Sequence, residues 1–97
     1  MTHTNALSWC TALGGTLPIP ASNEENEFLH NLGNTWLGLT TNDPFSYTNW
    51  HSGEPSGDGI YVQLINTTPW SGEKWNGDWN DSGPNDNLGS STCYTGY

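Results

Sequence analysis

The stretch Thr35-Trp36-Leu37-Gly38-Leu39-Thr40 (TWLGLT) places large apolar side chains on both faces of an extended run. Turn-forming residues bound it on each side, with glycine and asparagine before it and an Asn-Asp-Pro triplet after it. A short apolar run between such breakers is typical of a strand buried on both faces. We therefore predict a central strand over residues 35–40.

A short amphipathic helix is predicted upstream, from Thr4 to Leu13. Apolar side chains recur there at helical spacing, at Ala6, Cys10 and Leu13. Thr2 or Thr4 is a suitable N-cap, and the glycine pair that follows the helix favours its end.

A second helix is predicted to begin after Ser22, because Ser22 and Glu25 have the spacing of a reciprocal capping box. Phe28, Leu29 and Leu32 form its expected buried stripe, and Gly33 ends it.

Two further strands are predicted downstream, at residues 60–65 (IYVQLI) and within residues 74–81 (KWNGDWND). The intervening residues 41–60 are rich in turn formers, which favours a long irregular loop. Two helices followed by strands indicate an α+β fold rather than an alternating α/β fold.

The composition indicates one folded domain, residues 1–97. Its six tryptophans predict an aromatic-rich core, and its net charge is −9. One lysine and no arginine leave nothing to neutralise phosphates, which argues against binding to nucleic acid or insertion at an anionic membrane. The acid excess suits a soluble extracellular protein or a cation binder.

Cys10 and Cys93 lie near opposite ends of the chain. If they pair, the bond closes nearly the whole domain, and two buried thiols are the alternative. No apolar run is long enough for a membrane span and no signal peptide is evident, so an exported form implies a fragment or a mature chain.

Residues 53–58 read Gly-Glu-Pro-Ser-Gly-Asp (GEPSGD), which mounts two carboxylates and a hydroxyl around a proline between glycines. Glycine permits tight turns, and proline fixes a dihedral angle and tolerates a cis peptide. The loop is either a surface turn whose acids face water or a shaped segment that aims its oxygens at one point.

An ordered set of motifs resembles the C-type lectin-like domain: A…C…GG-L, E-N-E-F-L, WLGL, NW-x-x-GEP and WND. The set covers nearly the whole chain. The resemblance implies an α+β C-type lectin-like fold, with two short helices packed on small antiparallel sheets and a long irregular loop region.

The resemblance also implies one Ca²⁺ ion, a cis peptide before Pro55 and a bound carbohydrate or glycoprotein. The implied metal ligands are Glu54, Ser56, Asp58, Asn80 and Asp81, with Asp58 the loosest match. Sugar hydroxyls are expected to contact the ion and Glu54, Ser56, Asn80 and Asp81. Apart from the resemblance, Trp70 or Trp75 is a candidate to stack on a sugar face, with a core role as the default for each tryptophan. Such domains are expected to be secreted or surface-displayed, in several copies or within a larger parent protein.

Without the ion, carboxylates about 4 Å apart repel by several kcal/mol at an effective dielectric near 20, so an unloaded loop should loosen.

Three features depart from the family pattern. Ser56 replaces the usual amide or acid, and Tyr61 stands where an inner cysteine is common. The sequence also lacks counterparts of the terminal strands, so we expect the domain to be truncated at one or both ends. If Tyr97 precedes the last strand, Cys93 is not the family's closing cysteine and its pairing with Cys10 rests on spacing alone. Asn66 and Asn80 also begin glycosylation sequons, and a glycan on Asn80 would exclude it from the metal.

Other sites are less well supported. The histidines His3, His30 and His51 are scattered and expected at the surface, with no zinc-site spacing. Glu54 and Asp81 form a carboxylate pair, but hydrolysis of glycosides needs a shielded acid, so we do not expect an enzyme. The alternative function is a lectin-like scaffold without sugar binding that acts as a protein-binding, adhesive or ice-binding module.

Overall fold

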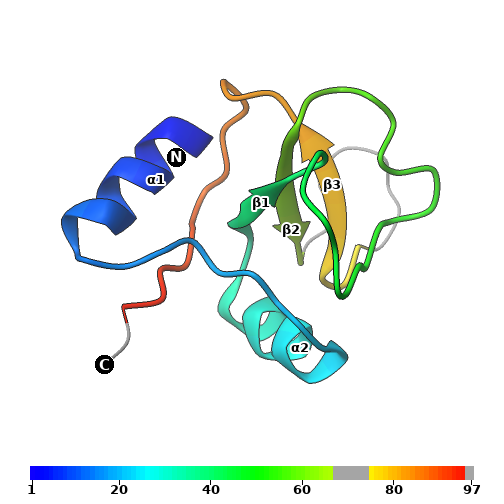
Figure 1. Ribbon diagram of the computed structural model, residues 1–97, viewed down its shortest axis with the longest axis horizontal. Helices are drawn as coiled ribbons and strands as arrows, with labels where there is room; N and C mark the ends of the chain where they lie inside the picture. The colour runs from blue at the N-terminus through cyan, green and yellow to red at the C-terminus, as the bar shows by residue number, and fades with distance from the viewer. Residues whose placement is uncertain (67–74, 96–97) are drawn as a thin grey trace.

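The computed structural model describes residues 1–66 and 75–95. Two helices precede three strands, as predicted, and the ribbon in Figure 1 shows them arranged around one sheet. The elements are α1 (His3–Ala12), α2 (Asn23–Leu32), β1 (Thr35–Thr40), β2 (Tyr61–Ile65) and β3 (Asp78–Ser82). The α+β prediction is confirmed.

The three strands form an antiparallel sheet in the order β1-β2-β3. β1 has the predicted bounds, but the prediction that it is the central strand is wrong, because β2 lies between the other two. β1 is nevertheless buried on both faces, with Trp36 in one core cluster and Leu37 in the other. Its outer edge is covered by the segment before α2, where Gly38 donates its N–H to the carbonyl of Pro18 at 2.9 Å.

The core consists of two clusters, each with one fully buried tryptophan, Trp36 or Trp79. The Trp36 cluster joins α1 to the rest of the domain. Its other buried members are Ala6 and Cys10 on α1, and Leu17, Ile65, Trp75 and Leu88 elsewhere in the chain. The Trp79 cluster joins α2 to the sheet through Leu29, Leu37, Leu39, Val62 and Leu64. Each helix therefore covers its own cluster.

The caps of the helices largely match the sequence pattern. Thr2 caps α1, its hydroxyl accepting a hydrogen bond from Asn5 N at 3.2 Å, and Ser22 accepts one from Glu25 N at 3.2 Å. Glu25 reaches back to the N–H of Ala21 rather than that of Ser22. The capping arrangement thus fixes where α2 begins.

The predicted apolar faces are too wide. Leu29 is fully buried, but Phe28 and Leu32 on α2 are 58% and 54% exposed, and Leu13 after α1 is 48% exposed. α2 contacts the domain through a narrow stripe that includes Asn26, 3% exposed. Apolar spacing alone does not say how much of a helix face the rest of the domain covers.

Asn26 takes a central place because it satisfies two buried groups at once. Its Oδ1 accepts the indole N–H of Trp79 at 2.8 Å, and its Nδ2 donates to the carbonyl of Gly77 at 3.0 Å. Replacing Asn26 would leave the indole N–H of Trp79 without its acceptor and the carbonyl of Gly77 without this donor, which is costly for buried groups.

The three histidines are partly exposed, so the prediction that they lie at the surface is confirmed in part. His3 stacks on Tyr61 with ring centroids 3.9 Å apart, and burial lowers its pKa. The side chain of His51 is 10% exposed and contacts Asp78. These contacts fix the imidazole rings of His3 and His51 against their neighbours.

The cysteines Cys10 and Cys93 form a disulfide, with Cα atoms 5.4 Å apart. Next to it, Thr16 and Tyr94 exchange backbone hydrogen bonds of 2.8 and 2.9 Å in an isolated antiparallel bridge. We predicted that the terminal strands are missing. Within the described residues, this isolated bridge is the pairing found between the segments near the two ends of the chain. Tyr97 lies outside the described residues. No helix in residues 1–66 and 75–95 is long and apolar enough to cross a membrane.

Replacing both cysteines with alanine should lower the free energy of unfolding by about 4 to 5 kcal/mol on the chain-entropy model. The reason is the long closed loop, since the two cysteines are 83 residues apart in the chain. Urea unfolding followed by tryptophan fluorescence measures the change. A loss below about 1 kcal/mol would contradict a constraint of this size.

Candidate functional site

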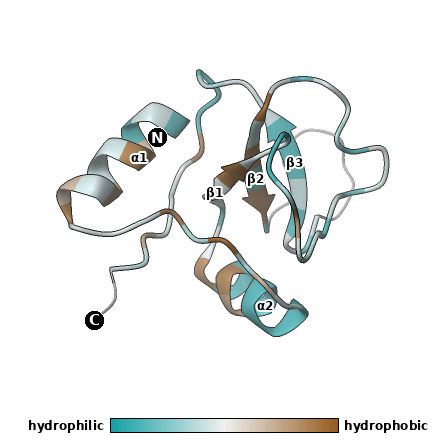
Figure 2. Cartoon of the chain, in the orientation of Figure 1, coloured by the Kyte–Doolittle hydropathy of each residue, from teal (hydrophilic) through white to brown (hydrophobic). Residues whose placement is uncertain are grey.

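Strand β3 is polar in sequence yet buried in the fold. Figure 2 shows it mostly hydrophilic beside the hydrophobic β1 and β2. Its last four residues are nevertheless all buried: Trp79, Asn80, Asp81 and Ser82. Buried polar side chains need partners, and here those partners mark the site.

The carboxylate of Asp81, 1% exposed, fixes the loop over residues 53–59 onto the end of β3. Its Oδ1 accepts the N–H of Ser56 at 3.0 Å and its Oδ2 that of Gly57 at 2.9 Å. The Glu54–Pro55 peptide is cis, as the family resemblance implied. At Gly59 an added Cβ would lie 2.2 Å from the backbone of Ser82, so only glycine permits this approach of loop to strand.

Three carboxylates converge where the loop meets the strand. Glu54, Asp58 and Asp81 each place one oxygen within 4.8 Å of the others. Ser56 lies among them: its N–H also donates to Glu54 Oε1 at 3.1 Å, and its hydroxyl donates to Asp58 Oδ2 at 2.9 Å. Within residues 1–66 and 75–95 this is the one such group of acidic, histidine or cysteine ligands. We call these three residues the carboxylate cluster.

The cluster shifts the pKa values of two members in opposite directions. Burial, and then the hydrogen bond with Asp81, raises the pKa of Glu54. Burial alone would raise the pKa of Asp81, but the hydrogen bond from Glu54 and those from the loop backbone lower it. Of the two carboxyl groups, that of Glu54 is therefore the first to take up a proton as the pH falls.

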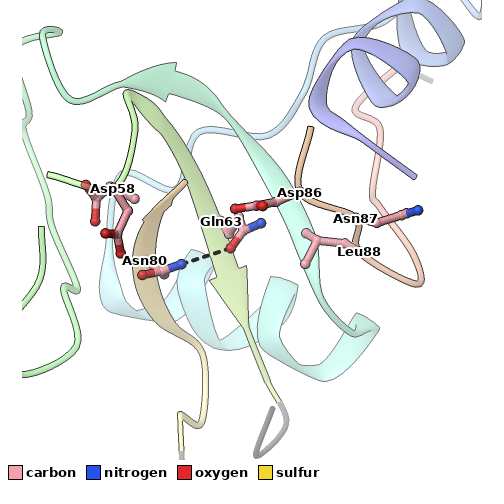
Figure 3. Close-up of a pocket in the computed structure, with 7 residues that line it drawn as sticks. Asp58, Gln63, Asn80, Asp86, Asn87 and Leu88 are labelled. Carbon is pink, nitrogen blue, oxygen red and sulfur yellow. Dashed lines mark hydrogen bonds between the residues drawn. The ribbon is translucent and has the colours of Figure 1, made fainter. Parts of the chain in front are cut away.

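Asn80 lies beside the cluster and is 6% exposed. Its Nδ2 donates to Gln63 Oε1 at 3.0 Å, and Figure 3 shows its amide oxygen on the side that faces Asp58. The hydrogen bond with Gln63 thus orients the amide so that its oxygen points toward the carboxylates.

The prediction that Trp75 stacks on a sugar is wrong. Trp75 is 3% exposed, belongs to the core, and its ring stacks on His51 with centroids 3.7 Å apart. Trp70, the other candidate, lies outside the described residues. Trp75 therefore serves the packing of the core.

The two sequon asparagines are both engaged in the fold. Asn80 is buried, and Asn66 donates its side-chain N–H to the carbonyl of His30 at 3.1 Å. A glycan on Asn80 is therefore incompatible with the folded domain.

Sequence reasoning missed a cavity of about 400 Å³ next to the carboxylate cluster. Its lining residues come from β2, β3, the loop and the segment after β3: Asp58, Gln63, Asn80, Asp81, Asp86, Asn87 and Leu88 (Figure 3). One signal was present in the sequence. Gln63 is the lone amide within the apolar run of β2.

Residues 1–95 match the Lectin C-type domain. The chain belongs to this family. Pulmonary surfactant-associated protein D of Bos taurus is 32% identical over 96 residues, which is 82% of this chain and 24% of that protein. The chain thus spans about a quarter of this relative's length.

Solved structures of C-type lectin domains share the fold. The mouse scavenger receptor C-type lectin carbohydrate-recognition domain gives a TM-score of 0.69 at 22% identity, covering 88% of this chain and 75% of that one. The cow CD23 domain, solved in the presence of a GlcNAc2Man3 oligosaccharide, gives 0.67 at 28% identity, covering 87% and 71%. A calcium-independent type II antifreeze protein gives 0.69 at 20% identity, covering 87% and 71%.

Family membership makes the chain a binding domain and not an enzyme. The last neighbour shows that the same fold also serves a protein without calcium. Fold alone therefore leaves the function to the residues of the site.

Replacing Asp81 with alanine should release the loop from the sheet. Gly57 loses its acceptor and Ser56 keeps only Glu54 Oε1, so we expect about 1 to 3 kcal/mol of destabilisation and faster hydrogen exchange at both amides. The Asp58→Ala variant is the matched control, because within residues 1–66 and 75–95 the side chain of Asp58 accepts only the Ser56 hydroxyl. Equal exchange at these amides in the two variants would contradict the anchoring role of Asp81.

Proposed function

We propose that the domain binds one Ca²⁺ ion at the carboxylate cluster and, through it, a carbohydrate. Glu54, Asp58 and Asp81 are the charged ligands in this proposal, with Asn80 and Ser56 as neutral ones. The observation that carries it is the convergence of the three carboxylates, from separate points of the loop and from β3, within 4.8 Å.

The donor set suits calcium. Ca²⁺ takes six to eight oxygens from carboxylates, amide carbonyls, hydroxyls and water, with tolerant geometry. The cluster offers carboxylates together with the Asn80 amide oxygen and the Ser56 hydroxyl, and no nitrogen or sulfur ligand accompanies them in the described part of the chain. Burial and the neighbouring Asp81 raise the pKa of Glu54, and a hard divalent cation would oppose both effects by favouring the ionised carboxylate.

Ser56 carries the least weight among these ligands. Its hydroxyl already donates to Asp58 at 2.9 Å and lies 3.4 Å from Asp81 Oδ1. It therefore serves first to bring two carboxylates together, and ligates only by turning its lone pairs to the ion.

The rim of the site is open to a ligand. Asp58 is exposed and Glu54 half-buried, while Asp81 forms the base. The bound ion supplies coordination positions for sugar hydroxyls, and the same carboxylates accept hydrogen bonds from those hydroxyls. A site so shallow binds single sugars weakly, so useful avidity needs several copies on one surface or within a larger parent protein. Secretion or surface display fits this use.

Calcium should raise the melting temperature of the domain. At an ion concentration 100 times the dissociation constant the stabilisation is about 2.7 kcal/mol, and a chelator should reverse it. Glu54→Gln and Asp58→Asn should remove most of the shift. Glu24→Gln and Glu27→Gln on α2 remove the same charge at a distance and should leave it intact. Differential scanning calorimetry measures all five proteins.

Glycan binding is tested on the same proteins with an array in calcium and in chelator. Binding lost in chelator and in Glu54→Gln supports the lectin function. A calcium shift in melting temperature without glycan binding makes the ion structural and favours the scaffold alternative, as a protein-binding or ice-binding module. The absence of both effects contradicts the proposal.

Calcium affinity should fall as the pH is lowered. Protons compete with the ion at Glu54, and the raised pKa of Glu54 makes this competition begin at a higher pH than for a glutamate at its ordinary value of 4.5. Isothermal titration calorimetry across the acidic range measures the affinity. An affinity that stays constant down to pH 4.5 would contradict protonation of Glu54 as the competing event.

The ion-free domain should respond in the opposite sense. Because the folded-state pKa of Glu54 is raised, its contribution to folding is complete below pH 4.5 and is lost as the pH rises through the folded-state pKa. Melting in chelator serves as the control for the calcium titration.

A further inference from the structure

Helix α2 carries the two most exposed of the large apolar side chains in residues 1–66 and 75–95. Phe28 is 58% exposed and Leu32 is 54% exposed, and neither belongs to a core cluster. They stand four residues apart, so they are neighbours on the helix surface rather than scattered residues. Single exposed apolar residues are ordinary, whereas an adjacent pair at this exposure favours an interaction surface.

Two exposed acidic side chains adjoin this pair. Glu24 lies one helical turn before Phe28, and Glu27 follows Glu24 by three residues. Neither acid has an ion-pair partner among residues 1–66 and 75–95. Figure 2 shows the consequence, since α2 is hydrophilic toward its start and hydrophobic toward its end. We call Glu24, Glu27, Phe28 and Leu32 the outer face of α2.

The stability of the helix explains only one of the two acids. Glu24 lies in the first turn, where the helix dipole favours a negative charge, but Glu27 lies beyond that turn. Like charges at this spacing on a helix also repel each other. Their field reaches the neighbouring loop: burial raises the pKa of Tyr47 most, and the charges of Glu24 and Glu27 raise it further. A cationic partner would relieve this repulsion.

The charge of the chain disfavours a second copy as that partner. The chain has a net charge of −9, no arginine and one lysine, Lys74, which lies outside the described residues. Two such chains repel each other, and neither offers the other a cationic surface within residues 1–66 and 75–95. An anionic membrane surface is repelled by the same acids.

We propose that the outer face of α2 docks a basic amphipathic helix of another protein. Side chains four residues apart form the ridge that packs against a second helix, and Glu24, Phe28 and Leu32 form such a row. The apolar stripe of the partner packs against Phe28 and Leu32, and its Lys or Arg side chains pair with the two acids.

The charges also determine the direction of the partner helix. Lys and Arg are most favourable in the last turn of a helix, because the dipole is negative there. An antiparallel partner places that last turn beside the acidic start of α2. Its apolar residues, toward its own start, then lie opposite Phe28 and Leu32.

The first experiment selects the partner chemistry from a mixture. A phage-displayed library of helices about 15 residues long, with apolar residues fixed at helical spacing and the other positions random, is selected against the domain. The enriched helices should carry Lys or Arg in their C-terminal half. Enrichment of helices without this charge pattern, or no enrichment, overturns the inference.

The second experiment locates the binding surface with an enriched helix as a free peptide. Phe28→Gln should weaken its binding at least about tenfold, measured by calorimetry. Leu7→Gln on α1 is the matched control, since Leu7 is 46% exposed, and should change binding by less than about twofold. Both side chains are exposed enough for the variants to fold, which circular dichroism checks. Equal binding to the two variants overturns the inference.

The third experiment separates a local charge effect from attraction to an acidic protein. Glu24→Gln combined with Glu27→Gln should weaken peptide binding about fivefold at low ionic strength. Glu54→Gln combined with Asp58→Asn removes the same charge at the carboxylate cluster, and in chelator should change peptide binding by less than about twofold. Equal losses in the two double variants overturn the inference.

The remaining measurements address other occupants and the relation to calcium. Sedimentation of the domain alone should show a monomer, and the domain should not bind anionic vesicles. A dimer or a vesicle complex that Phe28→Gln dissociates overturns the inference in favour of a second copy or a membrane surface. Peptide binding should be the same in calcium and in chelator, because the outer face shares no residue with the carboxylate cluster. Failure of this inference therefore leaves the proposed lectin function standing.

Discussion

The site depends on one buried carboxylate at the end of a strand. Asp81 receives two backbone N–H groups from the loop, and because β3 pairs with β2 along its whole length, that carboxylate is fixed relative to the sheet. The loop has no strand or helix of its own between Gly53 and Gly59, so these hydrogen bonds determine its shape. The same contacts that order the loop also lower the pKa of Asp81, which keeps this residue charged. Structure and electrostatics are therefore set by the same atoms.

A strand as polar as β3 is stable in the interior because each of its side chains has a defined partner. Trp79 donates to Asn26 on α2, Asn80 donates to Gln63 on β2, and Ser82 donates to Asp86 in the following segment. Buried donors and acceptors that are matched contribute modestly, whereas unmatched ones cost about 1 to 3 kcal/mol each. The helix, the sheet and the segment after β3 thus hold the strand from three sides. The Asp81 carboxylate meanwhile accepts the N–H groups of Ser56 and Gly57 from the loop.

The sequence predicts what is local and misses what depends on distant partners. Residues 35–40 were assigned correctly as a strand because their apolar run and their breakers are adjacent in the chain. Phe28 and Leu32 were wrongly assigned to the core, because their burial depends on how much of α2 the sheet covers. The convergence of Glu54 with Asp81 followed from motif order, since the family fixes how separate segments meet. The cavity at Gln63 had no such guide, because its walls are 86–88 and 58–63, which only the fold brings together.

The negative charge of the carboxylate cluster limits which groups can bind at this site. The chain carries a net charge of −9, and its single lysine, Lys74, lies outside the described residues. Within the described part, the hydrogen-bond donors to the carboxylate cluster include backbone N–H groups and the Ser56 hydroxyl. Oriented N–H dipoles offset part of one charge, and the repulsion that is left between three carboxylates within 4.8 Å favours binding of a cation over binding of an anion. Asp86 adds a further carboxylate to the cavity that Asp58 and Asp81 also line, so an anionic group would be repelled there as well.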